Sequence, residues 1–428
     1  MDTIFALASA AGKAGVAVVR ISGPSALETC AELGAVMRDH DRRLVRLLDQ
    51  NGELIDEAFV ISFAEGRSFT GEQVVELQTH GSPAIVSAVL RRLEELGLRP
   101  ADAGEFTRRA LDNGKLDLAR VEGLADLIDA ETDSQRRQAV RVFNGALGEL
   151  TDRWRQKLLR AAALLEATID FVDEDVPVDV YPEVRELVSE VRAEVYHEAS
   201  GVKVRERVRD GFEVAFVGPP NSGKSTLLNR LAGRDAALTS DIAGTTRDVI
   251  EVKMDLGGLP VTMLDTAGIR ESSDFLEGLG IERGKKRAEM ADVRVHLLDT
   301  HVNLKPLSEF GFDIYVLAKA DLRDDNPILA VSGQNGMGVD ELLNQISGYL
   351  ERQVASAGMA TRSRHERALT SAMMALDIVS AGLNATDTPA DLLAEDLRLS
   401  IRDLDSLIGR VDVESVLGEI FSSFCIGK

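Results

Sequence analysis

The chain has 428 residues, 44% of them hydrophobic, and a formal net charge of −22 at pH 7. This length predicts two or three domains, and the hydrophobic content is ample for packed cores, which excludes a disordered chain. The negative charge argues against a protein that binds nucleic acid through a broad basic surface, because phosphate recognition normally draws on basic residues. Any contact with RNA is therefore expected to be local or to be supplied by a partner.

The cysteines and the N-terminus indicate in which cellular compartment the protein is found. Cys30 and Cys425 are far apart and form neither a disulfide framework nor a C-x-x-C pair, which is typical of a reducing environment. An acid at position 2, together with Lys13 and Arg20, does not suit a secretory signal, and no run of 18 apolar residues predicts a membrane span. We expect a cytoplasmic protein that does not enter a membrane.

Residues 1–115 are expected to form a compact α+β domain. Short β-rich runs occur at residues 16–21, 58–63 and 74–78, and one helical stretch is predicted over residues 83–96.

Helical patterns flank a segment of alternating strands and helices. Residues 116–210 have apolar residues at helical spacing, and Pro177 and Pro182 are expected to break them into at least two helices. Residues 211–350 alternate strands and helices. Residues 351–428 are helical again, with four apolar residues on one face: Leu397, Ile401, Leu404 and Ile408. Since each amphipathic face needs a partner, the economical architecture is a helical domain, built from both sides of an inserted nucleotide-binding domain.

Two basic clusters flank that inserted segment: Lys203, Arg205, Arg207 and Arg209 before it, and Arg362, Arg364 and Arg367 after it. Their basic residues alternate with apolar, polar or acidic ones. This pattern favours solvated faces over an RNA-binding surface.

Residues 218–225, GPPNSGKS, form a phosphate-binding P-loop pattern between an apolar run at 214–217 and a helix-like stretch at 226–232. Glycines let the backbone N–H groups point at phosphate, Lys224 can reach the β- and γ-phosphate oxygens, and the Ser225 hydroxyl can bind Mg²⁺. The further nucleotide-binding residues expected here are Asn221, Ser222, Gly223 and Thr226.

Two later motifs resemble those of Ras-like GTPases. Asp265-Thr266-Ala267-Gly268 follows an apolar run, so Asp265 is expected to hold Mg²⁺ and Gly268 to sense the γ-phosphate, with Thr266 beside them. Gly244-Thr245-Thr246-Arg247-Asp248 resembles the first switch, where Thr246 would complete the Mg²⁺ shell. Ile269 stands where Ras-type enzymes carry a water-orienting glutamine. Either hydrolysis is slow, or another group positions the water.

The base-recognition motif departs from its usual form. Ala318-Lys319-Ala320-Asp321 occupies the place of N-K-x-D. Asp321 suits guanine, because its carboxylate can accept hydrogen bonds from both the ring N–H and the exocyclic amine. Ser332-Gly333-Gln334 falls where the last guanine loop belongs. Ala318 lacks the asparagine side chain that would contact the base and brace the P-loop, so weaker nucleotide binding is expected.

Across its whole length the chain resembles the bacterial tRNA modification GTPases of the MnmE (TrmE) family. The resemblance is carried by the G motifs and by seven further segments: DTI at 2–4, VRISGP at 19–24, FTGE at 69–72, ELQTHG at 76–81, GEFTRRA at 104–110, NGKLDL at 113–118 and FCIGK at 424–428.

This resemblance implies an N-terminal α+β domain that binds tetrahydrofolate and forms a homodimer, a helical domain, and an inserted Ras-like P-loop GTPase domain stimulated by K⁺. It also implies a partner, the FAD- and NADH-dependent protein MnmG. Together they would add a carboxymethylaminomethyl or aminomethyl group to carbon 5 of the tRNA wobble uridine. The one-carbon unit would come from a formyl or methylene tetrahydrofolate.

Residue roles follow from the same resemblance. Folate would contact Arg20, Glu76, Lys115 and Lys428. Potassium would be bound by Asn221 and by the segment that contains Ser240, Ile242 and Thr245, where Ser240 and Thr245 also contact the nucleotide. Glu277 would position the attacking water. Cys425 has two open interpretations, a nucleophile or acid/base group near the folate, or a structural packing role.

A rival hypothesis is a regulatory GTPase switch in ribosome assembly. Only the GTPase segment supports it, and it leaves residues 1–115 without a role.

Overall fold

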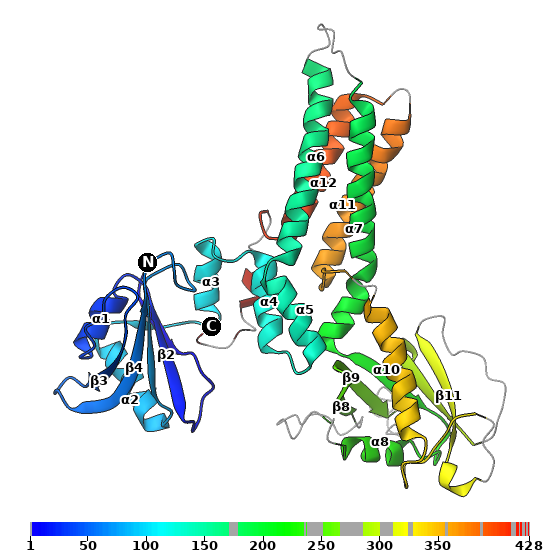
Figure 1. Ribbon diagram of the computed structural model, residues 1–428. Coiled ribbons are helices and arrows are strands. Elements are labelled where there is room, and N and C mark those ends of the chain that lie inside the picture. The colour runs from blue at the N-terminus through cyan, green and yellow to red at the C-terminus, as the bar shows by residue number, and fades with distance from the viewer. Residues whose placement is uncertain are drawn as a thin grey trace, which may run out of the picture. The chain divides into compact units, whose positions relative to one another are not determined.

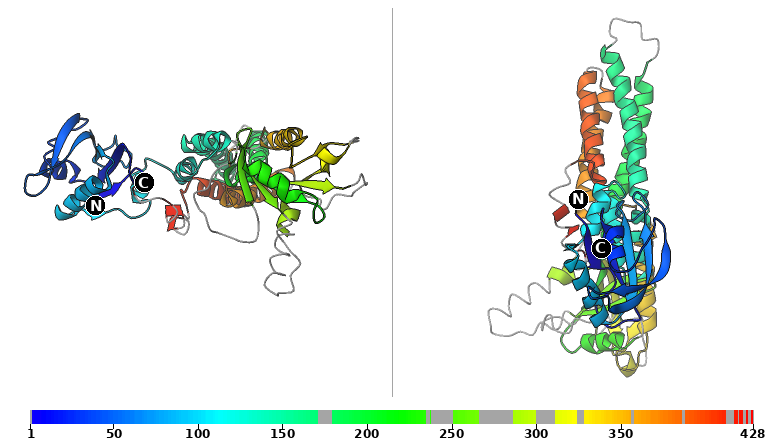
Figure 2. Two further views of the ribbon diagram at one scale, coloured as in Figure 1. Left: turned by 90° about the horizontal axis from the view of Figure 1, so that it is seen from below. Right: turned by 90° about the vertical axis from the view of Figure 1, so that its left-hand side faces the viewer.

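The computed structural model describes residues 2–170, 179–234, 237, 251–265, 286–299, 311–323, 328–355, 358–385, 388–411, 417, 418, 420, 421, 424 and 427. The chain divides into two compact units, one made of Met1–Ala125 with Asp405–Lys428 and the other of Asp126–Leu404. Figure 1 draws the elements of both, and Figure 2 adds two further views.

The first unit is built on a six-stranded sheet in the order β3-β4-β5-β2-β1-β6. The strands are β1 (Ile4–Leu7), β2 (Val16–Ser22), β3 (Arg42–Leu48), β4 (Leu54–Phe63), β5 (Val74–His80) and β6 (Arg99–Pro100). Neighbours are antiparallel except β1 and β6, which run parallel. The strands predicted at 16–21, 58–63 and 74–78 are confirmed as parts of β2, β4 and β5.

The two faces of this sheet differ. Helix α2 (Pro83–Glu95) covers one face, where Val89 and Leu93 join Ile21 and Leu77 in the main core. Because side chains alternate along a strand, the neighbours of these strand residues point to the opposite face. There Ile4 and Ala6 meet Phe106 in a second, smaller core.

Residues 1–115 contain more helix than predicted. The stretch at 83–96 is confirmed as α2, but α1 (Ala26–Glu32) and α3 (Glu105–Asp112) are additional. Each has only 7 or 8 residues, which is too short for a hydrophobic period of 3.6 residues to stand out in the sequence.

The helical part of the second unit contains α5 (Asp133–Phe143), α6 (Ala146–Asp170), α7 (Tyr181–Asp210), α11 (Ser363–Asn384) and most of α12 (Ala390–Leu407), while α4 (Leu118–Ile128) begins in the first unit. α7 packs against both α6 and α11 (Figure 1). The helix that precedes the nucleotide-binding part therefore packs on a helix that follows it, as the sequence predicts.

One expectation for this region is confirmed and another is wrong. Residues 116–210 form more than one helix, since α6 ends at Asp170 and α7 begins at Tyr181; Pro182 lies in the first turn of α7, where its fixed φ fits and its missing N–H has no intrahelical partner to lose. Pro177 lies outside the described residues. The basic clusters are more than solvated faces, since Arg205 and Arg209 donate to backbone carbonyls and Arg362 pairs with Asp126.

The nucleotide-binding part is an α/β sheet in the order β12-β11-β10-β7-β9-β8. Its elements are β7 (Phe212–Val217), α8 (Lys224–Ala232), β8 (Glu251–Leu256), β9 (Leu259–Asp265), β10 (Val293–Leu298), β11 (Phe312–Ala318), η1 (Ala320–Leu322), β12 (Ala330–Val331) and α10 (Val339–Ala355). All neighbours are parallel except β8 and β9. Helices α8 and α10 share one core with the sheet through Leu228 and Ile346.

Within the described residues, no helix has the length and apolar character needed to cross a bilayer.

Candidate functional site

The loop between β7 and α8 has the conformation of an anion cradle. Asn221 and Gly223 have positive φ values of 62° and 96°, which turn successive N–H groups toward one side. At Gly218 a Cβ atom would lie 2.7 Å from the Leu297 carbonyl oxygen, so only glycine fits. The strand, loop and helix occur in the order that the P-loop pattern predicts.

Lys224 lies inside this loop and is 3% exposed. Its Nζ donates to the carbonyl oxygens of Gly218 at 2.7 Å and Pro219 at 2.8 Å, and to Ser222 Oγ at 3.3 Å. Burial lowers the pKa of Lys224, while the carboxylates of Asp265 and Asp299 act in the opposite direction. All three hydrogen-bond partners are neutral oxygens, so the ammonium suits an added anion such as phosphate.

The two predicted Mg²⁺ ligands that the structure describes lie together. Ser225 Oγ donates to Asp265 Oδ2 at 2.7 Å, and Asp265 is only 1% exposed at the end of β9. A hydroxyl and a carboxylate are the hard oxygen donors that Mg²⁺ prefers. These residues therefore fit the ion; the third predicted ligand, Thr246, lies outside the described residues.

A cavity of about 260 Å³ adjoins the P-loop. It brings together seven predicted residues: Asn221, Ser222, Gly223, Thr226, Lys319, Asp321 and Ser332. Gly333 and Gln334 also line it, with apolar walls from Leu297, Leu322 and Val331. No motif marks those apolar residues in the sequence. A cavity with an apolar wall and the Asp321 carboxylate suits a purine base that carries hydrogen-bond donors.

The loop after β11 is held without an asparagine. Ala318 is 1% exposed, and its methyl group belongs to the core of the sheet. Arg323 Nε donates to the Ala318 carbonyl oxygen at 2.8 Å, and Lys319 Nζ lies 3.6 Å from Asp299 Oδ1. No sequence motif marks Arg323, which holds this carbonyl in the base-recognition loop.

Arg20 and Glu76 face each other on the second face of the first unit's sheet. They are direct partners of β2 and β5, with Arg20 Nη2 2.9 Å from Glu76 Oε1. The Arg20 guanidinium also lies 5.6 Å and 5.7 Å from the ring centres of Phe69 and Phe106. A charged pair beside two aromatic rings suits a flat conjugated ring that carries both polar edges and an acidic tail.

Lys115 borders the same loop as Phe69. Its Nζ donates to the Gly66 carbonyl oxygen at 2.6 Å, and a Cβ at Gly71 would lie 3.2 Å from Lys115 Cε. Two described residues of the predicted folate site, Arg20 and Lys115, thus contact one segment, residues 66–71, and Glu76 pairs with Arg20.

An ion-pair network joins residues from several of the segments that resemble the family. Arg109 is 7% exposed and donates to Asp2 Oδ1 at 2.8 Å, to Glu72 at 3.2 Å and to Glu105 Oε1 at 3.1 Å. Arg99 binds Asp2 and Glu105 as well. The hydrogen bond from Arg99, and next that from Arg109, hold the pKa of Asp2 below its usual value. These residues tie the N-terminus and the Phe69–Glu72 loop to α3.

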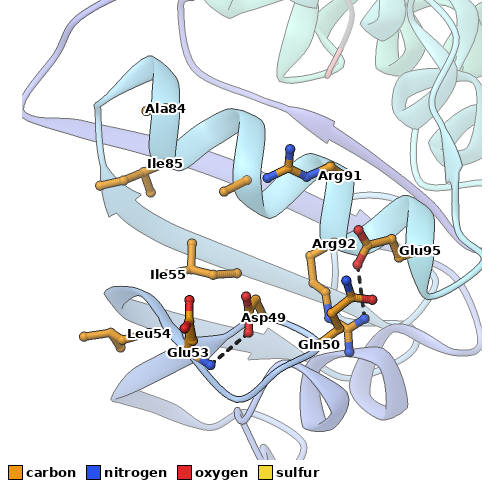
Figure 3. Close-up of a pocket in the computed structure, with 11 residues that line it drawn as sticks. Asp49, Gln50, Glu53, Leu54, Ile55, Ala84, Ile85, Arg91, Arg92 and Glu95 are labelled. Carbon is orange, nitrogen blue, oxygen red and sulfur yellow. Dashed lines mark hydrogen bonds and ion pairs between the residues drawn. The ribbon is translucent and has the colours of Figure 1, made fainter.

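A larger cavity of about 380 Å³ in the first unit contains none of the predicted residues. Figure 3 shows it between α2 and the turn that joins β3 to β4. Because α2 covers the other face of the sheet, this cavity lies on the side away from Arg20 and Glu76. Its rim charges already contact neighbours, since Asp49 accepts from the Glu53 N–H and Arg92 pairs with Glu95.

The C-terminal motif packs within the first unit. A Cβ at Gly104 would lie 2.9 Å from the Phe421 ring and 3.1 Å from Phe424. Gly427 has a φ of 101°, and a Cβ there would clash with the Leu7 carbonyl oxygen at the end of β1.

Nine predicted site residues lie outside the described residues: Ser240, Ile242, Thr245, Thr246, Thr266, Gly268, Glu277, Cys425 and Lys428.

Family comparisons cover nearly the whole chain. Residues 3–115 match the model described as the GTP-binding protein TrmE N-terminus, and residues 118–425 match the MnmE helical domain.

Proteins named tRNA modification GTPase MnmE align with 100% of this chain and over 100% of their own length. The identity is 58% for Cereibacter sphaeroides (strain ATCC 17025 / ATH 2.4.3), 57% for Ruegeria pomeroyi and 48% for Paracoccus denitrificans. Among solved structures, the G domain of the T. maritima FeoB iron transporter aligns with 32% of this chain and 98% of its own, with 21% identity and a TM-score of 0.23.

Proposed function

Because the chain belongs to the MnmE family of tRNA modification GTPases, we propose that it couples GTP hydrolysis to modification of the tRNA wobble uridine in the cytoplasm. Together with MnmG, it adds a carboxymethylaminomethyl or aminomethyl group to carbon 5, using a folate one-carbon unit. Residues 1–115 bind folate and dimerise, residues 116–210 and 351–428 form the helical domain, and residues 211–350 form the G domain.

The observation that carries the GTPase proposal is the cavity in which the P-loop and the base-recognition loop meet. Lys224 binds the β- and γ-phosphate oxygens from inside the loop, and Asp321 accepts hydrogen bonds from guanine. Ser225 and Asp265 hold Mg²⁺ with Thr246; when bound, this ion supplies positive charge to the phosphate oxygens. Thr226, Ser240, Thr245, Thr266, Gly268, Lys319 and Ser332 complete the nucleotide contacts.

Hydrolysis needs positive charge beside the phosphates and, because Ile269 replaces the usual glutamine, another group that positions the water. Asn221 lines the cavity beside the P-loop, and we assign it to K⁺ together with oxygens of Ser240, Ile242 and Thr245. When bound, K⁺ supplies positive charge beside the β- and γ-phosphates, where an arginine finger would act. Glu277 positions the attacking water.

The folate assignment rests on the polar face of the first unit's sheet. Arg20 and Glu76 offer a guanidinium and a carboxylate next to the rings of Phe69 and Phe106. Lys115 lies at the other end of the same loop and suits a folate carboxylate. Lys428 and Cys425 are assigned to this pocket as well.

Homodimerisation is assigned to the same sheet face. Leu44 and Phe59 are paired across β3 and β4 and are 67% and 40% exposed, and Val16 of β2 is 58% exposed. By strand alternation, all three point to the side of Arg20 and Glu76. A second copy of the chain would bury this apolar surface beside the folate site.

Light scattering tests this dimer. Leu44→Glu should convert the protein to a monomer, because it places a charge inside the interface. Met374→Glu, which changes an apolar residue of α11 with a similar exposure (60%), should leave the dimer intact. A dimeric Leu44→Glu protein would refute the assignment of this face.

Reconstitution tests the function as a whole. Purified protein and MnmG, with FAD, NADH, GTP, methylene tetrahydrofolate, glycine, K⁺, Mg²⁺ and unmodified tRNA, should yield the modified wobble uridine, detected by nucleoside mass spectrometry. Omission of folate or GTP should abolish the product. Product formed equally without GTP would contradict the proposed coupling.

A further inference from the structure

The base pocket lacks one connection that a GTPase of this type uses. An asparagine at position 318 would brace the P-loop, but the alanine side chain cannot form a hydrogen bond. Among the described residues, no hydrogen bond joins residues 318–321 to residues 218–225. The other base loop, residues 332–335, is the part of the pocket that does contact the P-loop helix.

Arg230, in the last turn of α8, makes such a contact with the second base loop. Its Nη1 donates to the Gln334 carbonyl oxygen at 3.0 Å and its Nη2 donates to the Asn335 carbonyl oxygen at 3.1 Å. A guanidinium presents two N–H groups in one rigid plane and can hold two neighbouring carbonyls at once. Since α8 begins at Lys224, Arg230 connects this loop directly to the P-loop helix.

Ser332 organises the same two residues from inside the loop. Its Oγ accepts the N–H of Gln334 at 3.2 Å and the N–H of Asn335 at 3.4 Å. Gln334 and Asn335 are thus held through both their N–H groups and their carbonyls.

Two glycines allow the loop to lie this close to α8. A Cβ at Gly333 would lie 2.6 Å from the Leu227 nitrogen and 2.7 Å from the Thr226 carbonyl carbon. At Gly336, with a φ of 86°, a Cβ would lie 2.6 Å from Arg230 Nη2. Side chains at these positions would push the loop away from the helix or displace the guanidinium.

We propose that Arg230 is a positioning residue for guanine-nucleotide binding, which holds the 332–335 loop on the P-loop helix and replaces the brace that Ala318 cannot supply. This inference rests on the proposed GTPase function. Arg230 acts through the loop, because Ser332, Gly333 and Gln334 line the cavity opposite Asn221 and Thr226, whereas Arg230 is not among its lining residues.

A labelled-GDP binding assay on the full chain tests the inference. Arg230→Ala should weaken GDP binding by about three- to tenfold, the range expected when charge-assisted hydrogen bonds on an exposed side chain are lost. Arg230→Lys should lie between Arg230→Ala and the unchanged protein, because an ammonium cannot match the planar fork. The matched control is Arg234→Ala, which removes an arginine that binds Asp340 at 2.8 Å; it should change the affinity less than about twofold.

A double-variant comparison separates bracing from a general loss of structure. In an Ala318→Asn background, Arg230→Ala should weaken GDP binding by less than about twofold, because the asparagine restores a second brace. An undiminished loss in that background, or equal losses for Arg230→Ala and Arg234→Ala, would overturn the inference. The unchanged protein is first compared with labelled GDP and ADP: absence of a guanine preference would instead refute the GTPase proposal.

Discussion

The proposed nucleotide site depends most on one residue, Lys224. It is buried, and among the described residues its hydrogen bonds go to neutral oxygens of its own loop. Burial lowers its pKa. Because none of these hydrogen-bond partners is charged, the ammonium suits a direct contact with a phosphate.

Lys224→Met should separate binding from stability. It removes a charge that burial disfavours, so without nucleotide the free energy of unfolding should change by no more than about 1 kcal/mol. The rise in melting temperature on addition of GDP should disappear. Thermal melts with and without GDP measure both quantities; a retained GDP shift would mean that another group binds the phosphates.

Gly333→Ala should damage the base pocket. The added methyl group would meet the backbone of α8 at 2.6 Å, and such overpacking costs about 1–3 kcal/mol. Both the GDP affinity and the free energy of unfolding should fall. The control is Gly233→Ala at the end of α8, where a Cβ would have no neighbour nearer than 3.7 Å. Similar behaviour of the two variants, in a GDP titration and a urea melt, would contradict the close approach.

Sequence predicts the motif residues better than the residues that support them. Lys224, Ser225 and Asp265 were identified because their chemistry follows from a short local pattern. Arg230 binds a loop more than 100 residues away in the sequence, and Arg109 binds Asp2 across 107 residues. Such pairs depend on tertiary contacts, and nothing in the local pattern of an arginine on a helix distinguishes them from a solvated side chain.

At the scale of elements, α7 holds the segment through which the chain leaves the nucleotide-binding part. Glu198 accepts the N–H groups of Met359 and Ala360, and Arg205 and Arg209 donate to the carbonyls of Gly358 and Thr361. Side chains of one helix thus satisfy both kinds of backbone group in the connection between α10 and α11.

Glu198→Ala should destabilise the helical part by about 1–3 kcal/mol, because it leaves buried N–H groups without an acceptor. Trp154 is the chain's only tryptophan and is fully buried in α6, so its fluorescence reports urea unfolding of this region. Glu186→Ala, at an exposed position of α7, should have little effect. Equal midpoints for the two variants would contradict a role for Glu198 in holding the segment.

The N-terminal strand should lose stability in acid. The hydrogen bonds from Arg99 and Arg109 lower the pKa of Asp2, so its contribution is present above its ordinary value of about 4 and is lost as the pH falls below it. Hydrogen exchange of the β1 amides, compared at pH 6 and pH 3.5, should show less acid weakening in Asp2→Asn than in the unchanged protein.

The control is Asp39→Asn, since Asp39 is exposed and has no hydrogen bond or ion pair among the described residues. In this variant the hydrogen-exchange protection of the β1 amides should fall in acid as much as it does in the unchanged protein. Identical acid responses of all three proteins would exclude the Asp2 pairs as the cause.

Long elements were predictable and short ones were not. α6, α7, α11 and α12 have 18 to 30 residues, enough for a helical period to appear. β3, with the sequence RRLVRLL, was missed because it is an edge strand whose arginines and exposed Leu44 obscure any alternation. β6 has only 2 residues, and its pairing with β1 comes from the tertiary fold.

At the scale of the whole molecule, the proposed K⁺ site beside Asn221 predicts that hydrolysis depends on the cation present. Replacement of K⁺ by Na⁺ should lower the rate of GTP hydrolysis by about tenfold or more, because a smaller ion cannot occupy the same oxygen cage equally well. Phosphate release measured in matched chloride salts tests this. Equal rates would remove potassium from the mechanism.

The most direct test of the central claim is nucleoside mass spectrometry of tRNA from cells that lack this protein. The 5-carboxymethylaminomethyl and 5-aminomethyl forms of the wobble uridine, and nucleosides derived from them, should disappear. The unchanged gene should restore them, and the Lys224→Met gene should not. Unaltered levels of these nucleosides in the deletion strain would contradict a role in tRNA modification.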